Sequence, residues 1–380
     1  MLIIFAGHIG RCCAGGQAWA NMQYLAGFRS LGHEVYYLED CGETSGAYDW
    51  DAEEWTEDLA YPARYVRECL EPLGLGDRWI YRAGDRSEGM PAADFQEVCS
   101  QADLLVVRAI PLWVWRPEYD RPRRRIFIDV DPGFTQIRMV GGDRFFAEAV
   151  HRYDQVFTIA QRIGAPDCQI PDAGLSWLPT RPPVSLPDWP LAPQDSASHF
   201  TSVMRWRGFM NVTHEGRKYG QRDQEFPKFL DLPRLSSQKF RLALVGAYPR
   251  LLLMERGWQV VPGEKVALTP PLYRSFIQES RGEFGVPKQG YVAMRGGWFS
   301  DRSVAYLASG RPVLMEDTGL QDWLPIGEGV VSFSDVASAV AGMEIINSDY
   351  ERHRLAARRL AEQYFATERV LPPLLDAAMG

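Results

Sequence analysis

The chain has 380 residues, of which 46% are hydrophobic and 24% charged, a composition typical of globular proteins at a length that favours two domains. Its formal net charge of −8 argues against electrostatic binding to nucleic acid or to an anionic membrane, so we expect neither partner. No apolar run approaches the roughly 18 residues needed to cross a bilayer, and the first residues lack a basic segment. We therefore expect a cytoplasmic protein without a membrane span.

The first half of the sequence alternates apolar runs with segments of helical spacing. Residues 2–6 form an apolar run, a glycine-rich loop follows, residues 17–31 carry apolar side chains at helical spacing, and residues 34–38 predict a second strand. A helix between two strands predicts that they pair in parallel. Further strands are predicted at residues 104–107, 125–130 and 155–159, which gives an open, doubly wound sheet.

Residues 39–86 are acidic and aromatic, with a helix predicted at residues 61–70. Two interpretations stay open for them. The segment is either a solvated excursion near the mouth of a cleft or an acceptor-binding element, in which Tyr48, Trp50 and Trp55 would stack on a sugar-like or apolar ligand.

Six prolines between residues 179 and 193 exclude regular helix and favour an extended tether, at which we place a domain boundary. The predicted units are an N-terminal domain over residues 1–180, a linker over 181–198, a second domain over 199–348, and a C-terminal helix over 349–380 that packs back on the first domain. In the second domain the alternation restarts, with strands predicted at residues 200–204, 241–245, 259–261, 290–294, 311–315 and 330–333.

The cysteines, at positions 12, 13, 41, 69, 99 and 168, form no C-x-x-C pair and no spacing typical of metal ligands. In a chain of this size they are predicted to be reduced and structural.

The stretch 282–319 carries the clearest signal of a binding site. A double glycine, Gly296 and Gly297, precedes Ser300 and Asp301, which open a short apolar-periodic helix. Such a helix start offers unpaired backbone N–H groups and the positive end of a dipole, and can hold a phosphate. An ordinary capped core helix is the alternative interpretation.

Other polar residues follow the predicted strands of the first domain, where ligands bind in parallel sheets. His8, Arg108, Asp129 and Asp131 would all face one crevice between the two domains.

Two doubly wound α/β domains joined by a tether resemble the GT-B fold of nucleotide-sugar-dependent glycosyltransferases. The segment SGRPVL after a glycine-led helix resembles the AxGxPV element of the family 4 C-terminal domain. The phrases IDVDPGFTQ, YGQRDQEF, SRGEFGVPKQGYV, GGWFSDRSVAYLASGRPV and DYERHRLAARRLAEQYF resemble a group of predicted bacterial glycosyltransferases over residues 125–370.

The resemblance implies that the second domain binds the donor nucleotide, with the diphosphate held by a basic pair and a helix N-terminus. Arg205 matches the arginine after the first strand of that domain, and Lys218 is the counterpart of its lysine. The phosphate loop would lie at residues 296–303 and a smaller facing loop at residues 15–16, so the implied donor-binding residues also include Gly296, Gly297, Ser300, Asp301, Arg302, Ser303, Gly15 and Gly16.

Retaining members of family 4 carry two glutamates eight residues apart, and the corresponding positions here are Gly297 and Ala305. Asp301, one turn before Ala305 on the same face, would take over the ribose hydroxyls, and Glu283 would approach the sugar. The stereochemical outcome is left open.

Glycosyl transfer requires charge stabilisation on the departing diphosphate, which Arg205, Lys218 and the helix dipole would supply without a metal. An inverting reaction also needs a base, for which the candidates are His8, Asp129 and Asp131. We favour Asp131 because Pro132 and Gly133 end its strand abruptly; a turn-capping role is the alternative. The D-x-D pattern of Asp129 and Asp131 is short, and we expect no metal.

Together with this resemblance, the sequence predicts a bacterial glycosyltransferase of the hexosyl type, moving a sugar from a UDP or dTDP sugar to a hydroxyl or other nucleophile of a small-molecule acceptor in natural product biosynthesis. No cofactor beyond the nucleotide sugar is expected, and the protein would be a monomer or homodimer. The alternatives are a nucleotide-sugar 2-epimerase and a catalytically silent nucleotide-binding partner protein. A Rossmann dehydrogenase is disfavoured because GHIGRCCAGG lacks G-x-G-x-x-G.

Overall fold

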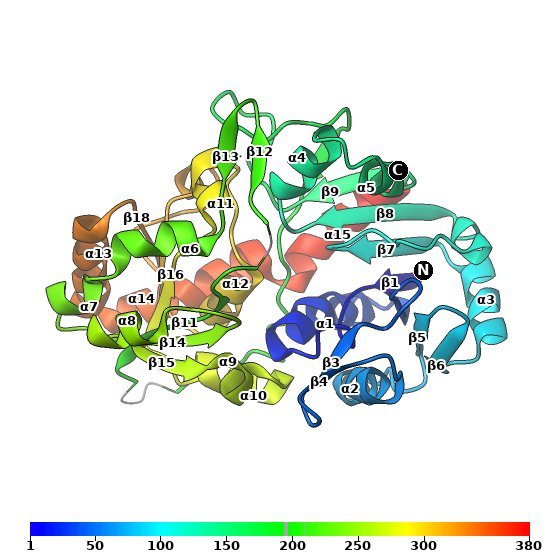
Figure 1. Ribbon diagram of the computed structural model, residues 1–380, viewed down its shortest axis with the longest axis horizontal. Helices are drawn as coiled ribbons and strands as arrows, with labels where there is room; N and C mark the ends of the chain where they lie inside the picture. Colours follow the sequence, from blue (N-terminus) through cyan, green and yellow to red (C-terminus); the bar gives the residue numbers. More distant parts are fainter. Residues whose placement is uncertain (194–196, 209) are drawn as a thin grey trace.

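The computed structural model describes residues 1–193, 197–208 and 210–380. It has two α/β lobes, each built on its own sheet, with the blue and cyan N-terminal lobe facing the green to orange C-terminal lobe (Figure 1). The predicted fold class, two doubly wound domains, is confirmed. No helix in the described parts of the chain is both long and apolar enough to cross a membrane.

The N-terminal sheet has eight strands in the order β10-β9-β8-β7-β1-β2-β5-β6. All neighbours pair in parallel except β5 and the edge strand β6. The central strands are buried along most of their length, as expected for a parallel sheet covered on both faces. The strands are β1 (Leu2–Ala6), β2 (Glu34–Asp40), β5 (Trp79–Ala83), β6 (Arg86–Gly89), β7 (Leu104–Arg108), β8 (Arg124–Asp129), β9 (Gln155–Thr158) and β10 (Trp177–Pro179).

Helices follow most of these strands, and the acidic, aromatic excursion contains a small antiparallel hairpin of β3 (Ala47–Asp49) and β4 (Glu54–Thr56). The helices of this lobe are α1 (Gly15–Ser30), α2 (Ala60–Leu70), α3 (Ala92–Gln101), α4 (Phe134–Val140) and α5 (Arg144–Val150).

The C-terminal sheet has six strands, all parallel, in the order β15-β14-β11-β16-β17-β18. They are β11 (His199–Arg205), β14 (Lys239–Val245), β15 (Gln259–Pro262), β16 (Gly282–Gly285), β17 (Val313–Glu316) and β18 (Val330–Phe333). A second hairpin joins β12 (Val212–His214) to β13 (Arg217–Tyr219). The helices are α6 (Arg222–Glu225), α7 (Leu232–Leu235), α8 (Arg250–Glu255), α9 (Gly263–Ala267), α10 (Pro270–Gln278), α11 (Gln289–Met294), α12 (Asp301–Ala308) and α13 (Val336–Ser348).

One predicted strand of this lobe is wrong. Residues 290–294 form most of helix α11, and the strand at this point of the sheet is β16, seven residues earlier. In α11 the buried side chains, Tyr291 and Met294, lie three residues apart, which is helical spacing. Five apolar residues are too few for periodicity to distinguish strand from helix.

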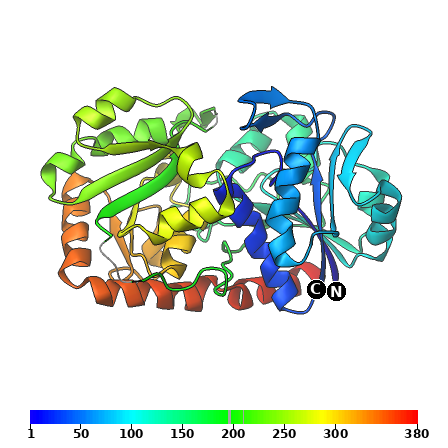
Figure 2. The ribbon, with the colours of Figure 1, turned by 90° about the horizontal axis from the view of Figure 1, so that it is seen from below.

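The last helices cross from one lobe to the other. The chain runs through α14 (Tyr350–Leu360), a π-helical turn at Ala361–Phe365 and α15 (Thr367–Met379), and Figure 2 shows this red segment passing beneath both lobes. Helix α15 packs so closely on α1 that a Cβ on Gly27 would lie 2.4 Å from Leu371.

The proline-rich segment between the lobes is packed rather than free. Val184 forms a β-bridge with Ala366, and the fully buried Trp189 lies edge-on to Trp19 with ring centroids 5.1 Å apart. The extended backbone predicted from the prolines is therefore fastened to both α1 and the crossing helices. The polar residues 194–196 of the predicted linker lie outside the described residues.

Candidate active site

A cavity of about 380 Å³ lies between the two lobes, where the carboxyl ends of strands from both sheets meet. The N-terminal lobe contributes the loop after β1, the end of β7 and the residues after β8, and the C-terminal lobe contributes the ends of β11 and β14 and the start of α12. Its charged lining residues are Arg108, Asp131, Arg205, Arg222, Glu264, Lys288, Asp301 and Arg302. Cations thus outnumber carboxylates, which suits an anionic ligand.

Two arginines of the C-terminal lobe stand out because neither pairs with a carboxylate among the described residues. Arg205 ends β11, and Arg222 opens α6, where its Nε donates to the Val286 carbonyl at 2.8 Å and its Nη1 to the Arg205 carbonyl at 3.3 Å. Burial, followed by the charge of Arg302, lowers the pKa of Arg222 to about 10, so it stays protonated at neutral pH.

The structure does not bring Lys218 to this pair. Lys218 is exposed on the β12–β13 hairpin and does not line the cavity. Arg222, four residues further along the chain, takes the position beside Arg205 that we assigned to Lys218. The sequence did contain a signal, because Arg222 belongs to the phrase YGQRDQEF that carries part of the family resemblance.

Two helix N-termini meet the cavity. Ser300 caps α12 by accepting a hydrogen bond from the Arg302 amide at 3.2 Å, and Asp301 is the first residue of the helix; both line the cavity. Ser303, one turn along, is fully buried and does not line it. Helix α1 begins after Ala14 with no side-chain cap, so its first-turn N–H groups keep their capacity to bind an anion.

Gly15 and Gly16 permit a close approach of α1 to the other lobe. A Cβ on Gly15 would lie 2.2 Å from the Thr269 carbonyl oxygen, and one on Gly16 would lie 2.9 Å from the ring of Tyr273. Gly16 lines the cavity whereas Gly15 does not. These glycines therefore set the spacing between the lobes at the foot of the site.

The double glycine lies away from the cavity, against the N-terminal lobe. The Gly297 amide donates to the Thr318 carbonyl at 2.8 Å, and the Gly296 carbonyl accepts from the Arg162 amide at 3.0 Å. A Cβ on Gly296 would come within 2.5 Å of Ile170, and Gly297 has a φ of +71°. Neither lines the cavity, so both serve the contact between the lobes.

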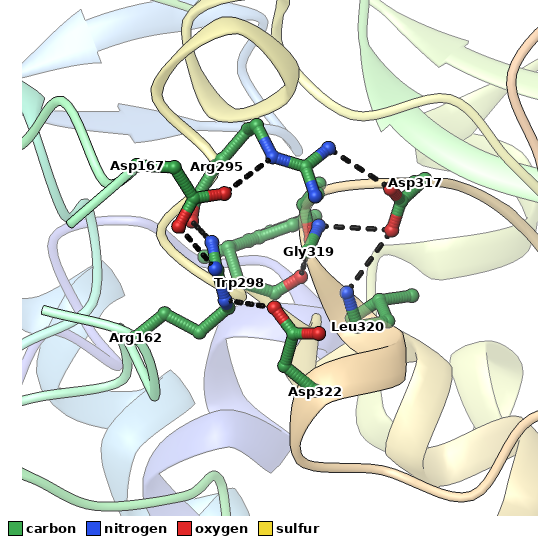
Figure 3. Close-up of polar contacts among 9 residues, drawn as sticks. Arg162, Asp167, Arg295, Trp298, Asp317, Gly319, Leu320 and Asp322 are labelled. Atoms are coloured by element: carbon green, nitrogen blue, oxygen red, sulfur yellow. Dashed lines mark hydrogen bonds and ion pairs between the residues drawn. The ribbon is translucent and has the colours of Figure 1, made fainter. Parts of the chain in front are cut away.

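Figure 3 shows the charged network beside this contact. Arg162 of the N-terminal lobe donates to the Arg295 carbonyl at 2.7 Å and pairs with Asp322 at 2.5 Å. Asp167 lies between the guanidinium groups of Arg162 and Arg295, and Arg295 also pairs with Asp317 at 3.2 Å. The network ties the 162–167 segment to the loop before α12 and to the loop after β17.

The favoured base, Asp131, lines the cavity and is engaged across the lobes. Its Oδ1 accepts hydrogen bonds from both Lys288 and Tyr291. Burial opposes ionisation of Asp131, but the charge of Lys288 and these hydrogen bonds outweigh it and hold its pKa below the ordinary value. Asp131 is therefore an ionised carboxylate at neutral pH.

Two other candidate carboxylates lie outside the lining. Asp129 is fully buried and accepts hydrogen bonds from the Thr135 hydroxyl, the Gln136 amide and the Thr158 hydroxyl. Glu283, also fully buried, pairs with Arg302 at 2.5 Å. Asp129 thus orders the loop after β8, and Glu283 orients Arg302, which does line the cavity.

His8 is buried after β1, and its Nδ1 has no hydrogen-bond partner among the described residues. Burial, followed by the charges of Arg11 and Arg108, lowers the pKa of His8 to about 4, so the imidazole is neutral at physiological pH. It does not line the cavity.

The sequence reasoning missed Glu39, which shapes the first loop. This fully buried carboxylate accepts hydrogen bonds from the amides of Ile9, Gly10 and Arg11 at 2.7–2.9 Å and from the Tyr37 hydroxyl at 2.6 Å. Glu39 thus accepts the hydrogen bonds of these loop amides inside the protein. Of the loop and the helix that follows it, only the backbone N–H groups at the start of α1 remain available to a ligand. A carboxylate directly after the strand predicted at residues 34–38 gave no sign of this role.

No protein-family model matches the sequence, and no curated protein matches it. Similar solved structures include an alpha-glucosyltransferase in complex with UDP-glucose and DNA containing an abasic site, with a TM-score of 0.59 and 11% identity over 100% of this chain and 99% of that one. The same kind of enzyme with UDP and a 13-mer DNA containing an HMU base gives a TM-score of 0.60 at 11% identity over 100% of both chains. Sucrose-phosphate synthase from Thermosynechococcus elongatus gives 0.55 at 13% identity, covering 99% of this chain and 98% of that one.

These complexes contradict our exclusion of nucleic acid. Glucosyltransferases with a similar overall fold were solved with DNA, so the exclusion drawn from net charge was wrong. Net charge averages over the whole surface, whereas binding depends on the local field of a groove.

The likeness to the alpha-glucosyltransferase and to the synthase spans nearly the whole length of each chain. In this chain two sheet-based lobes enclose one cavity. The chain therefore has the GT-B fold.

Proposed function

We propose that the protein is a glycosyltransferase that moves a sugar from a nucleotide diphosphate sugar to an acceptor bound in the same cavity. The observation that carries this proposal is the pair Arg205 and Arg222, which lie side by side at the cavity without carboxylate partners among the described residues. A diphosphate has the charge to match two guanidinium groups, and guanidinium–phosphate contacts are strong, charge-assisted hydrogen bonds.

The same residues supply the chemistry of the leaving group. When the bond between sugar and diphosphate breaks, negative charge grows on the diphosphate, and Arg205, Arg222 and the N-terminus of α12 stabilise it. This set needs no metal ion, and we propose a metal-independent reaction. The cavity-lining Asp131 remains our candidate for the base that accepts the proton of the acceptor hydroxyl, because it is ionised.

We propose that the acceptor is a small molecule that binds to the N-terminal lobe's side of the cavity. Trp50, from the aromatic excursion, and Tyr24, from α1, line this side of the cavity, whereas Trp55 is 74% exposed and does not. The faces of the Tyr24 ring are covered by Phe5 and by the Arg108 guanidinium, so Trp50 is the aromatic side chain proposed to stack on a sugar ring or an apolar acceptor. We further propose that the donor carries a hexose and that its nucleotide is UDP or dTDP.

The test combines nucleotide binding with product analysis. UDP or dTDP at 100 times its Kd should stabilise the protein by about 2.7 kcal/mol and raise its melting temperature, and Arg205→Ala should remove most of that rise. Incubation with nucleotide sugars and a panel of acceptors, with and without EDTA, should give a glycosylated acceptor in both cases.

The alternatives predict different results. A 2-epimerase would leave the sugar on the nucleotide with one inverted centre. A catalytically silent binding partner would bind the nucleotide without turnover. The observation in favour of this alternative is that Gly297 and Ala305 stand where retaining enzymes carry glutamates. Absence of any nucleotide-induced stabilisation would refute the proposal outright.

A further inference from the structure

Arg108 is a buried cation that the diphosphate site does not use. It ends β7 of the N-terminal lobe and lines the cavity with its side chain only 5% exposed. One of its nitrogens, Nη2, reaches Asp301 across the cleft at 3.2 Å. The other two, Nε and Nη1, are buried and have no hydrogen-bond partner among the described residues.

Arg82 of the same lobe shows how a structural arginine is satisfied. It is similarly buried, and its Nη1 donates to Glu118 at 2.7 Å and to the Tyr119 hydroxyl at 3.3 Å. A buried donor left unpaired destabilises the protein, and a charged one does so more strongly. Arg108 differs from Arg82 in that its unpaired donors border a cavity, where a ligand can satisfy them.

The surroundings of Arg108 favour an anion over a neutral ligand. The Arg108 guanidinium lies over the Tyr24 ring, with its Cζ 5.9 Å from the ring centroid, so this ring fixes the position of the guanidinium. Asp301 is the only carboxylate paired with it among the described residues, and that carboxylate is 41% exposed and therefore partly screened by solvent. The positive charge of Arg108 is thus incompletely compensated within the protein.

We propose that Arg108 binds an anionic group of the substrate, a carboxylate or a phosphate, other than the diphosphate of the donor. The proposal rests on the glycosyltransferase function above. It is separate from the diphosphate because Arg205 and Arg222 already match that group from the opposite lobe. The acid is either a uronic-acid carboxylate of the donor sugar or an acidic group of the acceptor.

The test uses inorganic phosphate as the probe, titrated at constant ionic strength into protein saturated with UDP. The wild-type protein should show a saturable rise in melting temperature. Arg108→Gln should abolish that rise or weaken phosphate at least tenfold, while its affinity for UDP stays within about twofold. Arg108→Lys, which keeps the charge, should retain part of the effect.

Arg82→Gln is the matched control, because it removes an equally buried, ion-paired arginine away from the cavity. It should lower the melting temperature yet leave the phosphate response unchanged. Phosphate binding that survives in Arg108→Gln, or an absence of saturable binding in the wild type, would overturn the proposal. If Arg108→Gln weakens UDP as much as Arg222→Gln does, Arg108 belongs to the diphosphate site and the proposal is also overturned.

Competition then identifies the source of the acid. Displacement of phosphate by UDP-glucuronic acid but not by UDP-glucose assigns the group to the donor, and displacement by glucose 6-phosphate but not by glucose assigns it to the acceptor. A protein that binds neither UDP nor dTDP but shows Arg108-dependent phosphate binding would refute the glycosyltransferase proposal while leaving the anion site in place.

Discussion

The replacement of Arg222 by glutamine is the sharpest test of the donor site, because the sequence and the structure point to different residues. By sequence the partner of Arg205 is Lys218, and by geometry it is Arg222. A charge-assisted hydrogen bond contributes roughly 1.5–3 kcal/mol. At about 1.4 kcal/mol per factor of ten, Arg222→Gln should raise the Kd for UDP by roughly 10- to 150-fold.

Lys218→Gln is the matched variant, since it also removes one positive charge from the same lobe. Lys218 is exposed on a hairpin and does not line the cavity, and exposed charges are largely screened beyond a Debye length of about 8 Å. Its Kd for UDP should stay within about twofold of the wild type. Isothermal titration calorimetry of both variants at physiological ionic strength measures the contrast.

Equal weakening by the two substitutions, or weakening by Lys218→Gln alone, would refute this assignment of the diphosphate site. Because Arg222 also donates to the Val286 carbonyl, the melting temperature of Arg222→Gln has to be measured beside its affinity. A loss of affinity without a comparable loss of stability is the result that the geometry predicts.

Two further predictions concern the contacts between the lobes. Asp131→Asn removes the carboxylate from Lys288, whose side chain is 10% exposed, and should destabilise the protein by about 3–5 kcal/mol, with much of that loss recovered in Asp131→Asn/Lys288→Met. The pKa of Asp131 is lower in the folded than in the unfolded protein, where it is about 3.9. The stability that the ionised carboxylate contributes is therefore present above the unfolded pKa and is lost as pH falls through the folded pKa. Urea titrations should show the free energies of unfolding of Asp131→Asn and wild type converging in acid. Arg162→Met should lower the melting temperature because it loses the bonds of Arg162 to Asp322 and to the Arg295 carbonyl. Adding Asp322→Asn to this variant should lower the melting temperature little further. Full additivity of the two substitutions would contradict a shared network.

The sequence predicted the two-sheet architecture well because buried parallel strands are short, continuous apolar runs between helices. It failed where a run was too short to show a period, as in α11, and where strands are polar or glycine-rich, as in β6 and β16. β6 is an edge strand and β16 has four residues, so the place of each is set by its neighbours in the sheet rather than by its own side chains.

The candidate site was predicted less completely, for a different reason. A glycine pair before a helix signals backbone freedom, but the sequence does not say what approaches the glycines. Gly296 and Gly297 are approached by the N-terminal lobe, through the side chains of Ile170 and Arg162. Ser300 and Asp301 reach the cavity because they lie at the helix start itself.

Arg222 was missed because it opens helix α6 whereas Lys218, four residues earlier, lies on strand β13, so the two side chains are placed by different elements. Its guanidinium is aimed by the carbonyls of Val286 and Arg205, which belong to segments far away in the sequence. Only tertiary structure places these acceptors beside α6.

The crossing of α15 beneath α1 has a consequence for synthesis on the ribosome. Leu25 and Phe28 of α1 share a hydrophobic cluster with Leu371 and Leu374. When the first lobe emerges, its partner helix lies more than 300 residues further along the chain and is not yet made. The part of α1 that faces α15, at Gly27, therefore stays without its partner until the end of translation, and the first lobe is completed only when the last helix docks.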